Sequence, residues 1–284
     1  MSASRERYSG LVCGALTIAI VAAPGCSVRI GSEGTPAPGI PSACSRVGSE
    51  RKLTIGAGSG SFSFVWDADH YVIAYSNPAT GHGDIYVAKI AADGSLIGSP
   101  EVVDATPSIS DLPNLLKTPG GYWVVWQEGS AGKAVFAHAL GPDAAPVGSG
   151  IDVAATQASQ SRPVLALTPG GQVAVAFMDS LDGKGGVEVA LVDPVSSAVT
   201  GPERVAASDN DGWPWIAGDD QALAMVWSDA QSTVYDVRFA LLDPRSLSLG
   251  PAFSLRGSAP HSGLLPRLIR TSFGFMSAWE DQGS

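Results

Sequence analysis

Five polar side chains that could bind a ligand or take part in catalysis recur along the sequence at a nearly constant distance. They follow short apolar segments, at spacings of 51, 51, 50 and 52 residues, and they are Asn77, Glu128, Asp179, Asp229 and Asp281. Carboxylate and amide oxygens gathered at one end of a fold could bind a cation, or a basic or polyhydroxy ligand. Two carboxylates at a defined separation are also what glycoside hydrolysis requires. The alternative is that these side chains accept backbone N–H groups in turns and keep the surface soluble.

The segments that would connect consecutive repeats contribute further candidates. Asp111, Asp209 and Asp211 are expected on the same face as the five polar residues, which would make one end of the molecule electronegative. The stretch "SDNDGW" (208–213) has the D-x-D-G spacing of a calcium loop. It lacks the downstream bidentate Glu of such loops, so a turn between repeats is the favoured interpretation and no cofactor is expected apart from calcium there. Trp213 is the aromatic residue best placed to stack on a sugar.

The patterns of common hydrolytic and phosphate-binding sites are missing from the sequence. The four histidines occupy unrelated positions of the repeat, and no G-x-S-x-G or H-E-x-x-H pattern is present. The "PGG" stretches at 119–121 and 169–171 lack the strand–helix context of a phosphate loop. A formal net charge of −10 argues against nonspecific binding of nucleic acid, which requires basic patches.

The elements that must position these residues are encoded by a repeat of about 51 residues. Three sets of markers keep this period, namely an aromatic (Tyr75, Trp126, Phe177, Trp227, Trp279), an alanine (Ala88, Ala139, Ala190, Ala240) and a proline (Pro113, Pro163, Pro214, Pro266). The second copy contains four apolar runs, at 114–118, 122–127, 134–140 and 150–155, separated by Gly- and Pro-rich turns. Such runs are typical of antiparallel strands. The second run is almost entirely apolar, so we expect both of its faces to be buried between neighbouring sheets.

Four strands in about 50 residues, repeated side by side, predict an all-β fold, a β-propeller of four-stranded antiparallel blades. The unit "HYVIAYSN…DIYVAKIAADGSLIGSP" resembles bacterial secreted or lipid-anchored propeller-repeat proteins, whose loose unit is GYxVVWxD…DIYxAxLDxDGxxxGxP. The resemblance covers almost all of 49–284 and implies the fold, but no particular reaction.

Closure of the propeller can also be predicted from the repeat. Segment 49–57 is similar to the fourth strand of other repeats, so it is predicted to complete the blade begun at the C-terminus and to remove exposed sheet edges. We expect five blades, the last of them three-stranded, if the chain is complete, and six to eight blades if it is truncated.

The first 48 residues predict export and a lipid anchor. Arg5 and Arg7 precede the apolar stretch 11–23, and small residues precede Cys26. This arrangement resembles a bacterial lipoprotein signal, which implies lipidation of Cys26; plain secretion and an uncleaved anchor are the alternatives. The predicted organisation is a signal peptide (1–25), a flexible tether (26–48) and a propeller (49–284). Cys44 pairs with Cys26 only if Cys26 is not lipidated.

Two functional hypotheses follow from these observations. The leading one is a non-enzymatic lipoprotein of the cell envelope whose propeller binds a glycan, a peptide or a protein, and which meets the membrane only through its lipid. The alternative is a secreted, glycosidase-like hydrolase with carboxylates at the acidic end of the propeller channel. Two carboxylates converging in a deep channel would favour the hydrolase, and a shallow, solvated channel end would favour binding.

Overall fold

The computed structural model describes residues 18–22, 27–30, 60–130, 133–154, 159–180, 185–206, 212–231, 234–257 and 262–282. Apart from turns and a single 3-10 turn at Pro78–Thr80, these residues form β-strands. In this part of the chain no helix is long and apolar enough to cross a bilayer.

The strands form five antiparallel sheets, which we number as blades 1 to 5 along the sequence. Blade 1 contains β3 (Phe62–Asp67), β4 (His70–Asn77), β5 (Asp84–Ala91) and β6 (Leu96–Asp104). Blade 2 contains β7 (Ser110–Thr118), β8 (Gly121–Glu128), β9 (Ala134–Leu140) and β10 (Pro146–Asp152). Blade 3 contains β11 (Gln160–Leu167), β12 (Val173–Asp179), β13 (Gly186–Val192) and β14 (Val199–Ala206).

Blades 4 and 5 depart from this regular pattern. In blade 4, β15 (Gly212–Gly218), β16 (Leu223–Gln231) and β17 (Val234–Asp243) are followed by two short strands, β18 (Ser248–Leu249) and β19 (Phe253–Ser254), which both pair with β17. Blade 5 contains β20 (Ser262–Thr271) and β21 (Gly274–Gln282), and it is completed by β1 (Ile18–Ala22) and β2 (Ser27–Ile30).

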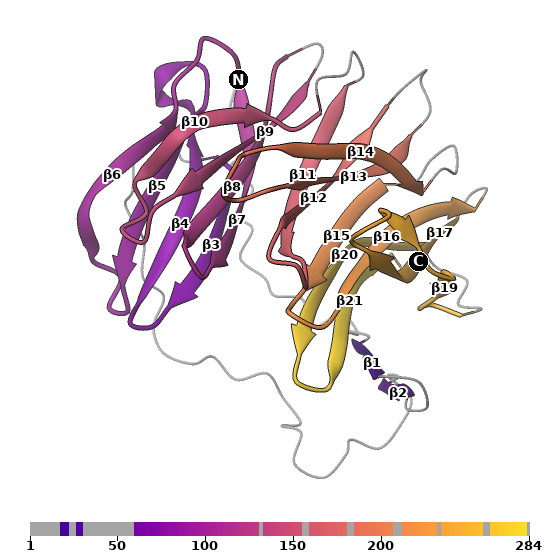
Figure 1. Cartoon of the computed structure of the whole chain (residues 1–284). Helices are drawn as coiled ribbons and strands as arrows, with labels where there is room; N and C mark the ends of the chain where they lie inside the picture. The colour runs from indigo at the N-terminus through magenta and orange to yellow at the C-terminus, as the bar shows by residue number, and fades with distance from the viewer. Residues whose placement is uncertain are drawn as a thin grey trace, which may run out of the picture.

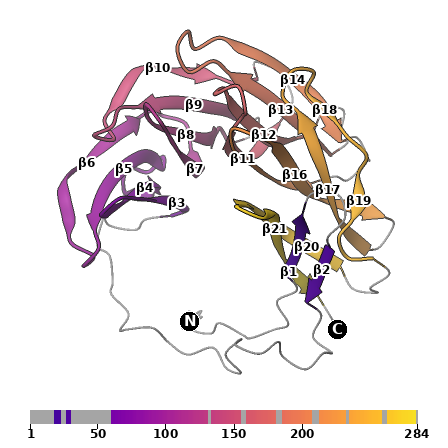
Figure 2. The ribbon, with the colours of Figure 1, turned by 60° about the horizontal axis from the view of Figure 1, so that its bottom comes forward.

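The blades stand side by side in an arc, as the repeat predicts (Figure 1). Figure 2 shows β3, β7 and β11 on the inside of the arc and outer strands such as β6, β10 and β14 on the outside. The first strands of neighbouring blades contact one another from β3 through β7, β11 and β15 to β20. The fold is therefore a β-propeller whose first strands surround a common centre, and the predicted fold class is confirmed.

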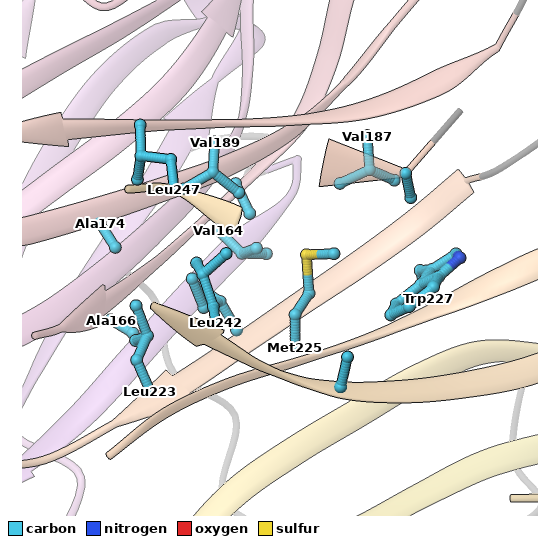
Figure 3. Packing of buried hydrophobic residues seen from close by; sticks show 14 of the residues in the cluster. Val164, Ala166, Ala174, Val187, Val189, Leu223, Met225, Trp227, Leu242 and Leu247 are labelled. Atoms are coloured by element: carbon cyan, nitrogen blue, oxygen red, sulfur yellow. The ribbon is translucent and has the colours of Figure 1, made fainter. Parts of the chain in front are cut away.

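The hydrophobic core is divided into clusters that lie between neighbouring blades. Between blades 3 and 4, Val164 and Ala166 pack against Leu223 and Met225 (Figure 3). The second strands contribute to clusters on both sides, and seven of the eight residues of β8 are buried. This confirms the prediction that the second run is covered on both faces. Each large apolar side chain buried in this way stabilises the fold by roughly 1.5–3 kcal/mol.

Polar links at equivalent positions of the repeat also join the first strands. The Ser63 hydroxyl accepts a hydrogen bond from the backbone N–H of Leu115 at 3.1 Å. One blade further on, the Asn114 side-chain oxygen accepts from the N–H of Leu165, also at 3.1 Å. These bonds satisfy backbone donors of one blade with side chains of the preceding blade, so they fix the register between blades.

Blade 5 is completed by strands from the N-terminal part of the chain, but not by the predicted segment 49–57. β1 lies next to β21, with Ile20 opposite Met276, and β2 pairs with β1 (Figure 2). The blade therefore has four strands rather than three. The N-terminal strand paired with β21 is 18–22, whereas the sequence predicts that 49–57 completes this blade. The apolar, β-branched sequence IAIVA suits a strand within a sheet. Residues 49–59 lie outside the described residues.

Candidate functional site

The first strand of blades 2 to 5 is interrupted near its start by the same backbone irregularity. The strand register shifts at this point in β7, β11, β15 and β20. The residue before each marker proline has a positive φ, with values of 50°, 55°, 48° and 50° at Leu112, Arg162, Trp213 and Leu265. Residues with a side chain seldom adopt this conformation, and a following proline disfavours it further. Each instance costs roughly 1–3 kcal/mol, and repeated strain at one place is typical of a functional site.

These irregularities surround a cavity of about 380 Å³ at the centre of the arc. Residues from β3, β7, β11, β15 and β20 line it, so all five blades contribute through their first strands. Because a bulge re-aims the side chains beside it, the residues before and after each proline reach the cavity. The X–Pro pairs in the lining are Leu112–Pro113, Arg162–Pro163 and Trp213–Pro214.

Two tryptophans and two arginines give the cavity its chemical character. The Arg267 guanidinium carbon lies 4.2 Å from the centre of the Trp215 ring, and that of Arg162 lies 5.8 Å from the Trp213 ring. Both distances are within the range of cation–π contact. The buried Trp213 Nε1 has no hydrogen-bond partner among the described residues. The lining therefore offers aromatic faces and cationic groups.

Within the described part of the chain, the two arginines of the cavity lack the carboxylate partners that several other arginines of the propeller have. Arg204, Arg238 and Arg270 form ion pairs with carboxylates at 3.3, 3.1 and 2.7 Å. Arg162 and Arg267 form no ion pair with a carboxylate of the described residues. Burial lowers the pKa of Arg267, and the nearby positive charge of Arg162 lowers it further. The cavity is therefore a site of positive potential in an acidic protein.

A row of exposed aromatic side chains runs from the cavity along β3. Phe62 and Phe64 line the cavity and are 62% and 57% exposed. Their ring centres lie 6.4 Å apart. Tyr71 of β4 connects Phe64 to Trp66, because its ring centre lies 5.9 Å from that of Phe64 and 4.6 Å from that of Trp66. In blade 2 the residue equivalent to Phe64 is Leu115, which is buried between blades. The row thus forms an apolar extension of the cavity.

Three of the predicted polar residues make local contacts near strand ends, and a fourth is exposed. Asn77 caps the 3-10 turn by accepting from the N–H of Ala79 at 3.1 Å. Glu128 accepts a hydrogen bond from Thr106 Oγ1 at 2.7 Å. Asp111 accepts from the N–H of Leu112 at 2.6 Å and from the hydroxyl of Ser61. Asp281 is exposed near the end of β21.

The remaining predicted residues are two ion-paired aspartates, three residues that fall outside the described part, and Trp213. Asp179 and Asp229 are buried and bind Arg204 and Arg238. Asp209 and Asp211 of the stretch 208–213 lie outside the described residues, and Cys26 does too. The structure does not bring the described carboxylates together in the central cavity, whereas Trp213 is part of its lining.

One group of carboxyls does come together between blades 1 and 2. Asp104 lies near Glu128 and Asp84 and accepts a hydrogen bond from Ser110 Oγ at 3.0 Å. Burial raises the pKa of Asp104, and the neighbouring carboxylates raise it further. Within the described ranges, no group of three or more His, Cys, Asp or Glu side chains has a geometry suited to a metal ion.

Sequence reasoning missed Arg162 and Arg267. The marker prolines are evident in the sequence, and the residue type directly before them differs from one repeat to the next. The residues before them are Leu112, Arg162, Trp213 and Leu265. This variation is the signal that could have identified the cavity, because the backbone at this position is the same in blades 2 to 5 while the side chain changes.

No protein-family model matches the sequence, and no curated protein does either. Among solved structures, an alpha-L-arabinanase from Penicillium chrysogenum complexed with arabinobiose aligns with a TM-score of 0.54 and 12% identity, over 76% of this chain and 72% of that chain. A protein of unknown function from Dyadobacter fermentans aligns with a TM-score of 0.54 and 10% identity, over 78% and 79%. An endo-1,4-beta-xylanase from Bacteroides thetaiotaomicron aligns with a TM-score of 0.50 and 10% identity, over 78% and 84%. Identities this low show the fold alone.

Fold and site together define a β-propeller with an aromatic and cationic central cavity.

Proposed function

We propose that this protein is a glycan-binding β-propeller whose central cavity receives the saccharide. The observation that supports this most directly is the placement of Trp213 and Trp215 in one cavity, at a position where the backbone is strained. Indole rings combine a large apolar face with a polar N–H, a combination that suits the C–H faces and hydroxyls of a sugar. A volume of about 380 Å³ lies within the range of small-ligand sites.

Binding is better supported than hydrolysis by the chemistry of the lining. Glycosidases of the common kind place two carboxyl groups on either side of the scissile bond. None of the cavity's described lining residues carries a carboxyl group. Asp179 and Asp229, two of the carboxylates that the repeat suggests for that role, form ion pairs with Arg204 and Arg238. The strained backbone then serves to present the indole rings rather than a pair of acids.

The same proposal includes a place in the cell envelope. Its support is the sequence of the first 26 residues, in which two arginines, an apolar stretch and small residues precede Cys26. Lipidation of Cys26 would hold the propeller outside the membrane on a tether rich in Gly, Ser and Pro. Metabolic labelling with a radioactive fatty acid tests this, because the label is expected on the wild-type protein and not on a Cys26→Ser variant.

A glycan array probed with the full chain tests the binding function. We expect binding to a limited set of oligosaccharides, and an affinity loss of about tenfold or more (about 1.4 kcal/mol) in Trp213→Ala and Trp215→Ala, because the sugar ring loses the aromatic face against which it lies. Phe273→Ala is the matched control, because this aromatic side chain is 80% exposed and is not part of the lining. The proposal fails if the array shows no binding, or if both tryptophan variants bind as the wild type does.

A further inference from the structure

We propose that the saccharide bound in the central cavity is acidic, with a carboxylate on its sugar ring held by Arg162 and Arg267. This inference rests on the proposed function and adds the chemical class of the ligand. It is carried by the two guanidinium groups of the lining and by the absence of a carboxylate partner for either among the described residues.

The two arginines come from blades that are not neighbours, and they meet because the first strands converge. Arg162 belongs to β11 of blade 3 and Arg267 to β20 of blade 5, and β15 of blade 4 lies between these strands. Trp213 and Trp215, which the guanidinium groups contact, both belong to β15. A sugar ring bound beside these indoles would therefore lie close to both cationic groups.

Electrostatics favour an anion at this place. Two like charges near one another in a partly buried cavity repel, and the lowered pKa of Arg267 has that repulsion as one of its causes. A carboxylate placed between them would remove the repulsion and accept charge-assisted hydrogen bonds. The overall charge of −10 disfavours the approach of anions elsewhere, so local positive charge of this kind requires a specific explanation.

The shape of the guanidinium group further restricts the chemical class of the ligand. Its planar fork matches a carboxylate through two parallel hydrogen bonds. Arg267 donates to the backbone oxygens of Leu265 at 3.5 Å and Pro266 at 3.1 Å through Nη1, and this holds the group beside the cavity. A uronic acid combines the carboxylate with a sugar ring that can lie against Trp213 or Trp215. Neither an isolated anion nor a neutral sugar uses both features of the lining.

The test compares two ligands that differ only in charge, a galacturonic acid trimer and its fully methyl-esterified form. Isothermal titration calorimetry with the full chain is expected to show about tenfold tighter binding of the free acid at low ionic strength, because a hydrogen bond to a charged group is stronger than one to a neutral group. This preference is expected to shrink as salt is raised from 0.05 to 0.5 M. Arg162→Gln and Arg267→Gln should each reduce the preference, and the double variant should bring it to within about twofold.

Controls separate loss of charge from loss of structure. Arg245→Gln removes an exposed arginine outside the cavity and should keep the full preference. Arg162→Lys keeps the charge without the fork and should retain part of it. The glutamine variants should bind the methyl ester as the wild type does, which shows that the cavity is intact.

The outcomes distinguish this inference from the function on which it rests. If both forms of the trimer bind equally well, or if the double variant keeps the preference, the acidic-ligand inference is overturned and saccharide binding stands. If inorganic phosphate or acetate binds as tightly as the trimer, the inference is overturned as well, because the sugar then contributes nothing. If no saccharide on the array binds, both proposals fall.

Discussion

Gln160 is a fully buried polar side chain whose contacts join two blades. Its Oε1 accepts from the N–H of Val135 at 3.0 Å, and its Nε2 donates to the carbonyl of Ala154 at 2.6 Å. Replacement by Leu leaves both backbone groups without these partners in the interior. We expect Gln160→Leu to lower the free energy of unfolding by about 2–4 kcal/mol. Urea denaturation measures this, with the exposed Gln221→Leu expected to change it by less than about 0.5 kcal/mol; equal stabilities of the two variants would contradict the assignment.

Asp104 gives a prediction about pH. Its pKa lies above the ordinary value of 3.8 because of burial first and of the carboxylates of Glu128 and Asp84 second. A carboxyl with a raised pKa in the folded state contributes stability below its unfolded pKa, and this contribution is lost as pH rises through the folded pKa. Asp104→Asn is therefore expected to be more stable than the wild type at pH 7, with a difference that diminishes as pH falls through the raised folded pKa of Asp104 and does not change further below 3.8. Urea denaturation from pH 3 to 7 measures it, and a difference that does not vary with pH would contradict the assigned burial.

For individual residues, the sequence predicted where polar side chains recur better than it predicted which residues they contact. The recurrence of Glu128, Asp179 and Asp229 after the second strand was visible in the period. Their partners were not, because Arg204 reaches Asp179 from the fourth strand of blade 3, whereas Arg238 reaches Asp229 from the third strand of blade 4. Such contacts depend on strand pairing and on the bulges that shift it, which the residue types do not specify.

The hairpin between the first and second strands of blade 2 depends on one glycine of its "PGG" turn. Gly121 has a φ of 139°, and a Cβ there would lie 2.2 Å from the carbonyl oxygen of Leu140. Gly120, its neighbour, has open space around it. We expect Gly121→Ala to lower the free energy of unfolding by about 2–5 kcal/mol, from backbone strain and overpacking together.

The adjacent Gly120→Ala is the matched control for this turn. It should alter the free energy of unfolding by less than about 0.5 kcal/mol, because its Cβ meets no other atom within 4 Å. Thermal unfolding followed by circular dichroism compares the two. A Gly121→Ala variant as stable as Gly120→Ala would show that the turn has a different backbone conformation.

Element boundaries show where prediction from the sequence ends. The expected strands at 114–118 and 122–127 correspond to Ser110–Thr118 and Gly121–Glu128 in the structure. The first strand begins before its proline because a bulge carries the chain across Pro113. The sequence predicts a strand that begins only after Pro113, since proline cannot donate to the ladder. The bulge accommodates it, and it is also what brings Leu112 and its equivalents to the cavity.

The whole molecule follows from the repeat because blades 2, 3 and 4 each bury their second strand against both neighbours. Apolar runs with a constant period of about 51 residues were enough to predict the blades and their order. The central cavity was not predictable, since its lining comes from five segments spread over residues 61 to 267. Only the arrangement of the first strands around one centre brings them together.

Closure of blade 5 gives a prediction for the complete chain. The structure places Ile18–Ala22 beside β21, and the sequence predicts that these residues belong to a leader removed before Cys26. If the leader is removed, segment 49–57 is the predicted replacement. Deletion of residues 1–30 should then leave the unfolding midpoint unchanged, and deletion of 1–59 should lower it by several degrees. A loss of stability already in the shorter deletion would assign closure to 18–22 and 27–30 instead.

The most direct measurement of the central claim is a crystal structure of the protein with an oligosaccharide that it binds on the array. The account predicts electron density for a sugar ring against Trp213 or Trp215, between Arg162 and Arg267 at the centre of the five blades. Density for the ligand at the strand ends near Glu128, Asp179 and Asp229, with an empty central cavity, would contradict it.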